Sequence, residues 1–171
     1  MSHAEIKIAV SSEFVRADKA TVWEKLGFYE HVSKRPPWLL RTVLPTPKEV
    51  EGSHNAVGDL CRCRYSDGGY LTKRITKIVP QEMIEFEIVE QSIRYQNSIK
   101  LLGGVIALNE YEEGQCAITM QTFFASRLNK YTYLSCAIKR VIRAMHQFVI
   151  SDLQEQLSGQ ESSTLVGNAS Y

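Results

Sequence analysis

The sequence has little of what would place the protein in a membrane, on nucleic acid or in a secretory pathway. No apolar run among its 171 residues approaches the roughly eighteen that a membrane-spanning helix needs. The first residues lack the basic and apolar regions of a secretory signal. Twenty basic residues stand against 19 acidic ones, so no global positive field favours an anionic polymer. We therefore expect a cytoplasmic protein that binds no nucleic acid and inserts into no membrane.

Cysteine is also scarce, and the four cysteines form no disulfide pattern. Cys61 and Cys63 are predicted on the same side of one strand, too close in sequence to bridge easily. His54 lies seven residues before Cys61, so these three residues could begin a metal site. Zinc-binding pairs, however, usually have two residues between the cysteines and lie in loops. We interpret the two thiols as small buried apolar side chains and expect no bound metal.

Motifs that hold a nucleophile, a catalytic zinc or a phosphate are absent too. The sequence has no Gly-x-Ser-x-Gly, no His-Glu-x-x-His and no glycine-rich phosphate loop. We therefore expect no cofactor.

The first third of the sequence predicts one strand and one or two short helices. Ile6, Ile8 and Val10 alternate with polar or small residues, which predicts a half-buried strand over 5–14. Asp18 is typical of the cap before a helix, here over 19–28. A further helical turn over 29–33 would end before the prolines at 36 and 37. The proline-broken segment 38–55 is predicted to be a lid or an edge strand.

The middle of the sequence predicts an antiparallel meander of five strands. Their expected ranges are 60–65, 70–79, 83–90, 95–111 and 116–125. Glycine-rich and acidic turns at 66–69 and 112–114 indicate hairpins, and Pro80 marks a third tight connection. Gly103 and Gly104 interrupt the fourth strand and indicate a bulge that lets the sheet curve.

Pairing Tyr65 with Tyr70 across the first hairpin would leave both faces of the sheet chemically mixed. One face would then carry Arg62, Arg64 and Lys73 among apolar residues. Such a mixture indicates a partly hydrated cavity on one face. The alternative is that the long basic stems lie over the edges of the sheet.

The last pattern, over 127–157, is a long amphipathic helix. Its apolar residues recur at three- and four-residue steps: Leu134, Ile138, Val141, Met145, Phe148, Val149 and Leu153. A curved sheet that closes on one such helix often leaves a cavity between them. The sequence therefore predicts an α+β fold with six to seven strands wrapped around the helix. We expect one domain over 1–157 and a disordered tail over 158–171.

This order of elements resembles the helix-grip fold of the START/Bet v 1-like (SRPBCC) superfamily over about residues 4–157. The landmarks are similar to those of bacterial polyketide cyclase/dehydrase-like members: Arg35-Pro36-Pro37-Trp38, Pro45-Thr46-Pro47, Val57-Gly58-Asp59, Asp67-Gly68-Gly69, Arg74-Ile75-Thr76, Gly103-Gly104 and Met145-His146. The resemblance implies a deep pocket between the sheet and the last helix, with 38–55 near its mouth. Many similar sequences have a glutamate where this chain has Lys73, which inverts the local charge. The fold hosts both enzymes and passive binders.

We expect the pocket to bind a hydrophobic or aromatic small molecule, lipid-like or polyketide-like. The predicted ligand-binding residues are Trp38, Arg62, Lys73, Phe86, Ile88, Met145, His146 and Phe148. Arg62 or Lys73 would orient a polar end of the ligand. The basic residues of this hairpin could instead face solvent and pair with glutamates, and Trp38 is either a lid or a plug against the core.

Two other functions remain open. The first is a cofactor-independent enzyme of the cyclase/aromatase or dehydratase type, with His146, Lys73 or Tyr131 as candidates for moving protons. In the alternative interpretation, His146 only bonds a neighbour and the tyrosine is structural. The second function is a chaperone-like module for protein interaction, which would need an exposed apolar patch. A homodimer is a further partner that the sequence leaves open.

Overall fold

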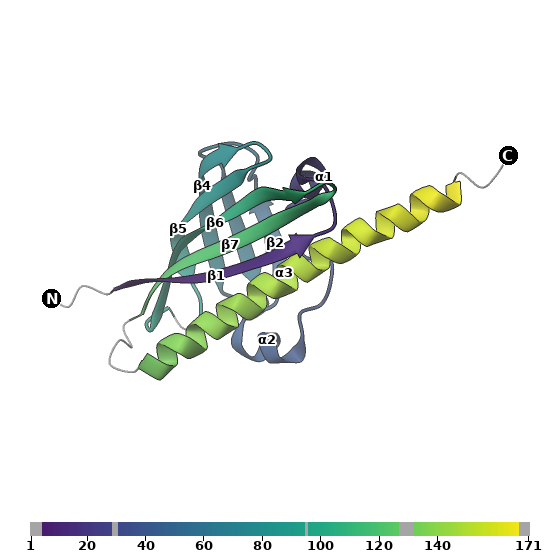
Figure 1. Ribbon diagram of the computed structural model, residues 1–171. Helices are drawn as coiled ribbons and strands as arrows, with labels where there is room; N and C mark the ends of the chain where they lie inside the picture. The colour runs from purple at the N-terminus through teal and green to yellow at the C-terminus, as the bar shows by residue number, and fades with distance from the viewer. Residues whose placement is uncertain (1–4, 29–30, 95, 127–131, 168–171) are drawn as a thin grey trace.

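A computed structural model describes residues 5–28, 31–94, 96–126 and 132–167. Within these ranges the chain forms one antiparallel sheet and three helices (Figure 1). In chain order the elements are β1 (Ile6–Val15), α1 (Lys19–Lys25), α2 (Trp38–Val43), β2 (Pro47–Gly52), β3 (Leu60–Tyr65), β4 (Tyr70–Val79), β5 (Met83–Ser92), β6 (Ile99–Glu112), β7 (Gln115–Ser126) and α3 (Thr132–Gly167).

The strands lie in the order β1-β7-β6-β5-β4-β3-β2, so β1 and β2 form the two edges. The long helix α3 crosses one face of this curved sheet (Figure 1). The core lies between them and includes Ile75, Ile106, Ile118 and Ile150. The predicted α+β helix-grip architecture is confirmed, with seven strands.

The segment 38–55, expected to be a lid or an edge strand, contains a helix followed by an edge strand. Helix α2 begins directly after Pro37, and Leu40 is its buried residue. Strand β2 begins at Pro47 and pairs only with β3. A proline is tolerated there because the first residue of an edge strand need not donate to a ladder.

The pairing of β3 with β4 corrects the predicted register. Tyr70 lies opposite Arg64, and Tyr65 closes the turn by bonding Gly69. Because Tyr65 pairs with Gly69, the loop has three residues rather than four, and Gly68 within it has a φ of 84°. A slip of one residue exchanges the two faces of a strand.

The face turned toward α3 is therefore not mixed, as the sequence had suggested. Cys61, Cys63 and Tyr65 of β3 are buried together with Leu71 of β4. Lys73 is the one basic residue on this side of the hairpin. The expectation that Arg62 and Arg64 share a face with Lys73 is wrong, because the turn is one residue shorter.

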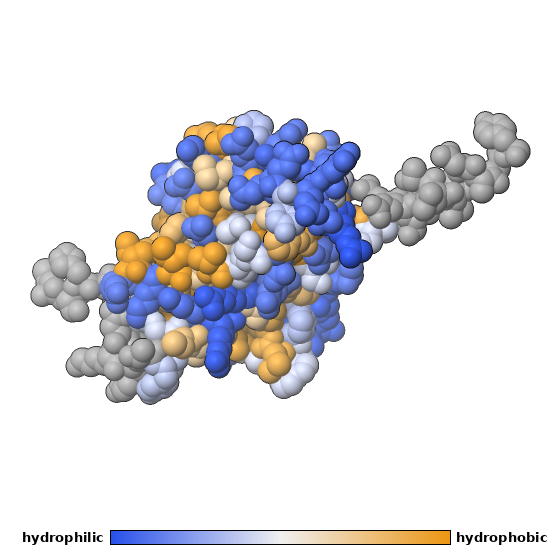
Figure 2. Space-filling model, viewed as in Figure 1, coloured by the Kyte–Doolittle hydropathy of each residue, from blue (hydrophilic) through white to orange (hydrophobic). Residues whose placement is uncertain are grey.

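Strand β1 is present as predicted, but its apolar side faces outward. Ile6 and Ile8 are 63% and 42% exposed, whereas Ala9 is fully buried. Figure 2 shows an orange patch over the N-terminal half of β1 and the neighbouring part of β7. The small residue faces inward because α3 packs against β1 on that side and leaves little room for larger side chains.

Helix α3 is longer than its apolar pattern. Its predicted start at 127 lies outside the described residues. Leu157 is the last buried side chain among those that the structure describes on this helix, yet the helix continues to Gly167, and Figure 1 shows this end projecting past the sheet. No helix among the described residues is long and apolar enough to cross a bilayer.

Two local predictions are confirmed: the helix cap at Asp18 and the bulge at Gly103. The Thr21 amide donates to Asp18 Oδ1 over 2.8 Å and caps α1. The pairing of β6 with β7 shifts register between Leu101 and Gly103, where Gly103 has a φ of 154°. This bulge bends the sheet over the space described next.

Candidate functional site

A cavity of about 490 Å³ lies between the sheet and α3. Helix α3 contributes residues at helical spacing, among them Ile138, Val141, Ile142, Met145 and Val149. The sheet contributes apolar side chains from β4 to β7, and Val43, Leu44 and Pro45 close one end. This volume lies within the range of about 300–1,000 Å³ for small-molecule pockets.

Lys73 is a buried cation in this largely apolar wall, which also includes Arg94. Its side chain is only 5% exposed. Its Nζ lies 4.4 Å from the centroid of the Phe28 ring and 5.5 Å from that of Phe86. Ring faces attract a cation, so the two phenylalanines hold the ammonium group at the cavity wall.

His146 also lines the cavity and is almost completely buried. Its Nε2 lies 2.8 Å from Thr122 Oγ1, and its Nδ1 lies 3.2 Å from Ser11 Oγ. Burial, with a smaller effect from the charge of Arg143, lowers the pKa of His146 to about 4. The imidazole is therefore neutral near pH 7, and its two hydrogen bonds connect α3 to β1 and β7.

The structure brings five of the predicted ligand-binding residues to one cavity. Lys73, Phe86, Ile88, Met145 and His146 all line it. They come from β4, β5 and α3, so only the folded sheet places them side by side.

The other predicted residues lie elsewhere. Trp38 is 65% exposed on α2, and Phe148 packs against the core without lining the cavity. Tyr131 lies outside the described residues. Tyr133, two residues further along the chain, is exposed on α3.

Arg62 faces away from the cavity, on the outer side of the sheet. It donates to Glu90 over 2.6 Å and to Thr72 over 3.0 Å. Arg64 and Arg74 form similar ion pairs with glutamates on this side. The expectation that Arg62 orients a ligand from the cavity wall is wrong, whereas the solvent-facing alternative fits these contacts.

A second cavity of about 240 Å³ lies beside the first. Phe28, Met120 and Val149 line both, so these side chains separate them. At its wall the rings of His31 and His54 lie 4.9 Å apart. Burial, and then the charge of Lys73, lower the pKa of His54.

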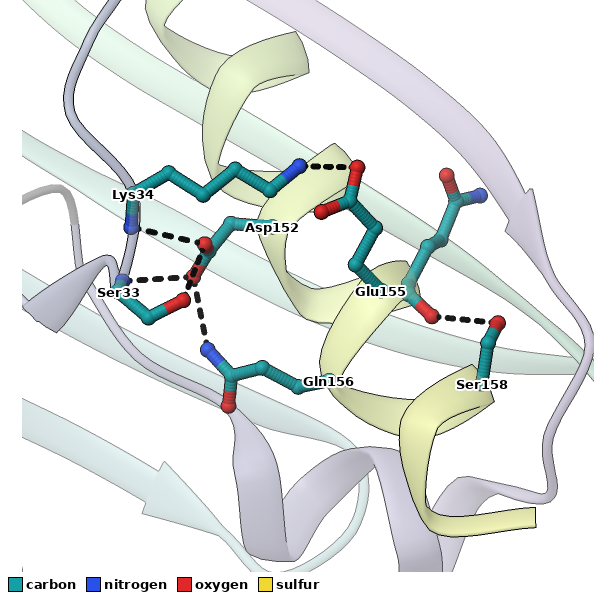
Figure 3. A network of polar contacts seen from close by, with 7 residues as sticks. Ser33, Lys34, Asp152, Glu155, Gln156 and Ser158 are labelled. Atoms are coloured by element: carbon teal, nitrogen blue, oxygen red, sulfur yellow. Dashed lines mark hydrogen bonds and ion pairs between the residues drawn. The ribbon is translucent and has the colours of Figure 1, made fainter. Parts of the chain in front are cut away.

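The sequence analysis missed Asp152, a buried carboxylate at the wall of the second cavity. Figure 3 shows it on α3, facing the segment at Ser33 and Lys34. It accepts from Ser33 Oγ over 2.7 Å, from Ser33 N over 3.0 Å and from Gln156 Nε2 over 2.7 Å. The sequence could have indicated this residue, because Asp152 is an acidic residue between the apolar positions 149 and 153 of the helix, on the side predicted to be buried.

We expect Asp152→Asn to lower the free energy of unfolding by about 1–3 kcal/mol at pH 7, because hydrogen bonds to a charged group are lost. Burial raises the pKa of this carboxyl, but hydrogen bonds from Ser33, Gln156 and Lys34 outweigh burial and lower it. Stability from the lowered pKa is present above the unfolded-state value and disappears as the pH falls through the folded-state value. Urea unfolding measures both effects.

The control is Glu155→Gln, which removes the exposed ion pair between Lys34 and Glu155, three residues further along α3 than Asp152. An exposed pair contributes little, so this variant should remain close to the wild type. Equal stability of the Asp152→Asn variant and the wild type would show that Asp152 does not hold the segment at Ser33.

Cys61 and Cys63 point into the core, and their sulfur atoms lie 3.9 Å apart. Within the described ranges, no group of three or more His, Cys, Asp or Glu side chains could hold a metal ion. The placement agrees with their interpretation as buried apolar side chains.

No protein-family model and no curated protein matches the sequence. Solved structures are similar in fold. Norcoclaurine synthase from Thalictrum flavum aligns with a TM-score of 0.60 at 12% identity, over 87% of this chain and 94% of that one. Major latex-like protein 151 from Panax ginseng gives 0.57 at 13% identity, over 88% and 97%. An uncharacterized protein from Bacillus thuringiensis gives 0.51 at 13% identity, over 84% and 99%.

These identities are low, so the likeness shows the fold alone. The chain has the helix-grip fold of Bet v 1-like proteins, as the order of its elements predicted. The similarity to the bacterial polyketide cyclase-like subgroup stays a prediction.

Proposed function

We propose that this helix-grip protein binds an apolar or aromatic small molecule between its sheet and α3, with the polar end of the ligand held at Lys73. The observation that supports the proposal is the cavity of about 490 Å³ with a largely apolar wall. Apolar burial would supply most of the binding free energy, and the single lysine of the wall would set the orientation.

A fluorescent apolar probe tests occupancy of the cavity. We expect N-phenyl-1-naphthylamine to bind the wild type and Val141→Trp to weaken that binding at least tenfold, because the new side chain would fill the space beside α3. The matched control is Val10→Trp, a change on the exposed side of β1. If the probe binds both variants equally well, the cavity is not its site. A separate experiment, native mass spectrometry of protein purified from its own host, would identify a natural ligand that co-purifies with the protein.

Lys73 is tested by a pair of probes that differ in charge. We expect Lys73→Met to weaken binding of 8-anilinonaphthalene-1-sulfonate about tenfold, since a charge-assisted contact is removed. Binding of the uncharged N-phenyl-1-naphthylamine should change much less. Equal effects on the two probes would mean that the lysine shapes the cavity without orienting a polar group.

The alternative function is a cyclase/aromatase-type enzyme that uses the same cavity. Norcoclaurine synthase, which has this fold, has been solved in complex with dopamine and hydroxybenzaldehyde. Lys73 and His146 would be the candidates for proton transfer here. A neutral His146 that is hydrogen-bonded at both nitrogens is a weak base, which favours binding over catalysis. Turnover that survives both Lys73→Ala and His146→Ala would exclude this assignment of residues.

A further inference from the structure

Helix α2 exposes two large apolar side chains at the surface. Trp38 is 65% exposed and Leu39 is 62% exposed, while Leu40 turns inward and is buried. Leu40 therefore anchors the helix to the core, while Trp38 and Leu39 face the solvent. Figure 2 shows orange surface at the bottom of the molecule, where Figure 1 places α2.

The chain around α2 carries charge of one sign. Residues 31–48 contain Lys34, Arg35, Arg41 and Lys48 and no Asp or Glu. Lys34 pairs with Glu155 of α3, whereas Arg35, Arg41 and Lys48 are exposed. The whole chain is almost neutral, so this segment is a local concentration of positive charge.

The same segment borders the large cavity. Val43 at the end of α2 lines the cavity together with Leu44 and Pro45, which follow it. A surface that contacted Trp38 and Leu39 would therefore lie next to this end of the cavity.

We propose that α2 and its flanks dock on an anionic lipid bilayer. Tryptophan prefers the boundary between apolar and aqueous phases, leucine prefers the acyl region, and arginine and lysine are attracted to anionic headgroups. A protein partner fits less well, because two side chains on a two-turn helix are small beside the roughly 800 Å² that each partner usually buries. The apolar patch of β1 lacks such a basic segment along its strand, where Lys7 is the only cation among 6–15.

Co-sedimentation of the full chain with lipid vesicles tests the proposal. We expect binding to phosphatidylcholine vesicles that contain about one-third phosphatidylglycerol, and much weaker binding to phosphatidylcholine alone or at high salt. Arg35→Gln with Arg41→Gln should weaken binding about 25-fold, since each cation contributes roughly a factor of five. Trp38→Ala with Leu39→Ala should weaken it at least tenfold. Trp38→Phe should retain sedimentation while the lipid-induced change in tryptophan emission is lost.

Two double variants serve as matched controls. Ile8→Ala with Val10→Ala removes exposed apolar side chains from β1, and Lys77→Gln with Lys100→Gln removes exposed cations from the strands. Both should bind vesicles like the wild type, and circular dichroism should show that every variant is folded.

Absence of binding to the anionic vesicles would overturn the proposal. Binding that is reduced equally by the control variants would also overturn it, since any apolar or basic surface would then suffice. A concentration-dependent dimer that is lost in the Trp38→Ala/Leu39→Ala variant would assign this surface to a second copy instead. The substituted side chains Arg35, Trp38, Leu39 and Arg41 do not line the cavity, so their effect on vesicle binding is separate from what the cavity binds.

Discussion

Unfolding at a series of pH values is expected to show that His146 makes the protein less stable in acid. The loss attributable to this residue should reach roughly 3 kcal/mol as the pH falls from 6.5 to about 4. In the His146→Gln variant this part of the pH dependence should disappear. Urea unfolding at fixed pH values, with wild type and variant compared at each pH, measures the difference.

The sign follows from where the proton binds. In the folded protein the pKa of His146 is lowered to about 4 by burial and by the nearby charge of Arg143, against 6.5 for the ordinary side chain. Between these two values the unfolded chain takes up a proton that the folded chain does not. Protonation therefore favours unfolding over this interval, and the stability is regained as the pH rises from about 4 to 6.5.

The contacts of His146 make the effect structural as well as electrostatic. Its hydrogen bonds to Thr122 and Ser11 connect α3 with β7 and β1 beside the cavity. A protonated ring would be a donor at both nitrogens in a buried place, which burial disfavours. Low pH is thus expected to loosen the contact between α3 and the sheet.

His54→Gln is the comparison for this experiment. His54 is half-buried, and its pKa is also lowered, by burial and by Lys73. Its removal should change the same part of the pH profile less than removal of His146. Identical pH profiles of the wild type and the His146→Gln variant would contradict the neutral buried state of His146.

Gly103→Ala is expected to destabilise the protein by about 3 kcal/mol or more, in the range that signals backbone strain or overpacking. A Cβ atom at this position would lie 2.2 Å from the carbonyl oxygen of Phe86 and 2.9 Å from the Cα of Glu87. Both are backbone atoms of β5, so no side-chain rotation can relieve the clash. The φ of 154° adds strain for any residue with a side chain.

The matched variant is Gly114→Ala in the turn between β6 and β7. Gly114 also has a positive φ, of 73°, but nothing lies within 4 Å of the added Cβ. This change should cost only about 1–2 kcal/mol, the energy of the left-handed conformation. Chemical denaturation of the two variants separates close backbone approach from conformational preference. Equal losses would show that β5 and β6 do not approach each other closely at the bulge.

Gly103 also lines the large cavity, and the ring of Phe86 lies against its neighbour Gly104. The close approach of β5 and β6 therefore shapes the wall that carries Phe86 and, one strand further, Lys73. An intact bulge is expected to be required for probe binding as well as for stability.

Local periodicity was sufficient to predict most of the elements. The alternation along β3 and β4 predicted their bounds, 60–65 and 70–79, and Asp18 predicted the start of α1. The paired glycines at 103 and 104 predicted the bulge of β6. These features depend on residues that are neighbours in the chain, so sequence reasoning could reach them.

The orientation of strands and side chains was harder to predict. Because the turn before Tyr70 is one residue shorter than predicted, Arg62 lies on the outer surface, whereas Lys73 lines the cavity. The apolar side of β1 faces outward because α3 covers its small residues. Asp152 acquires its role only through Ser33, which is 119 positions away in the chain.

The sequence by itself determined that strands are followed by one long amphipathic helix. Apolar residues repeat every two positions in a strand and about every 3.6 positions in a helix, and both repeats depend only on residues that are close in the chain. Only the tertiary structure decided which face of each strand is buried and which cation reaches the cavity. Register and packing depend on contacts between distant residues, and a shift of one position reverses every side chain of a strand. The order of the elements predicted the pocket, whereas the packing of the strands against α3 placed Lys73 and His146 in its wall.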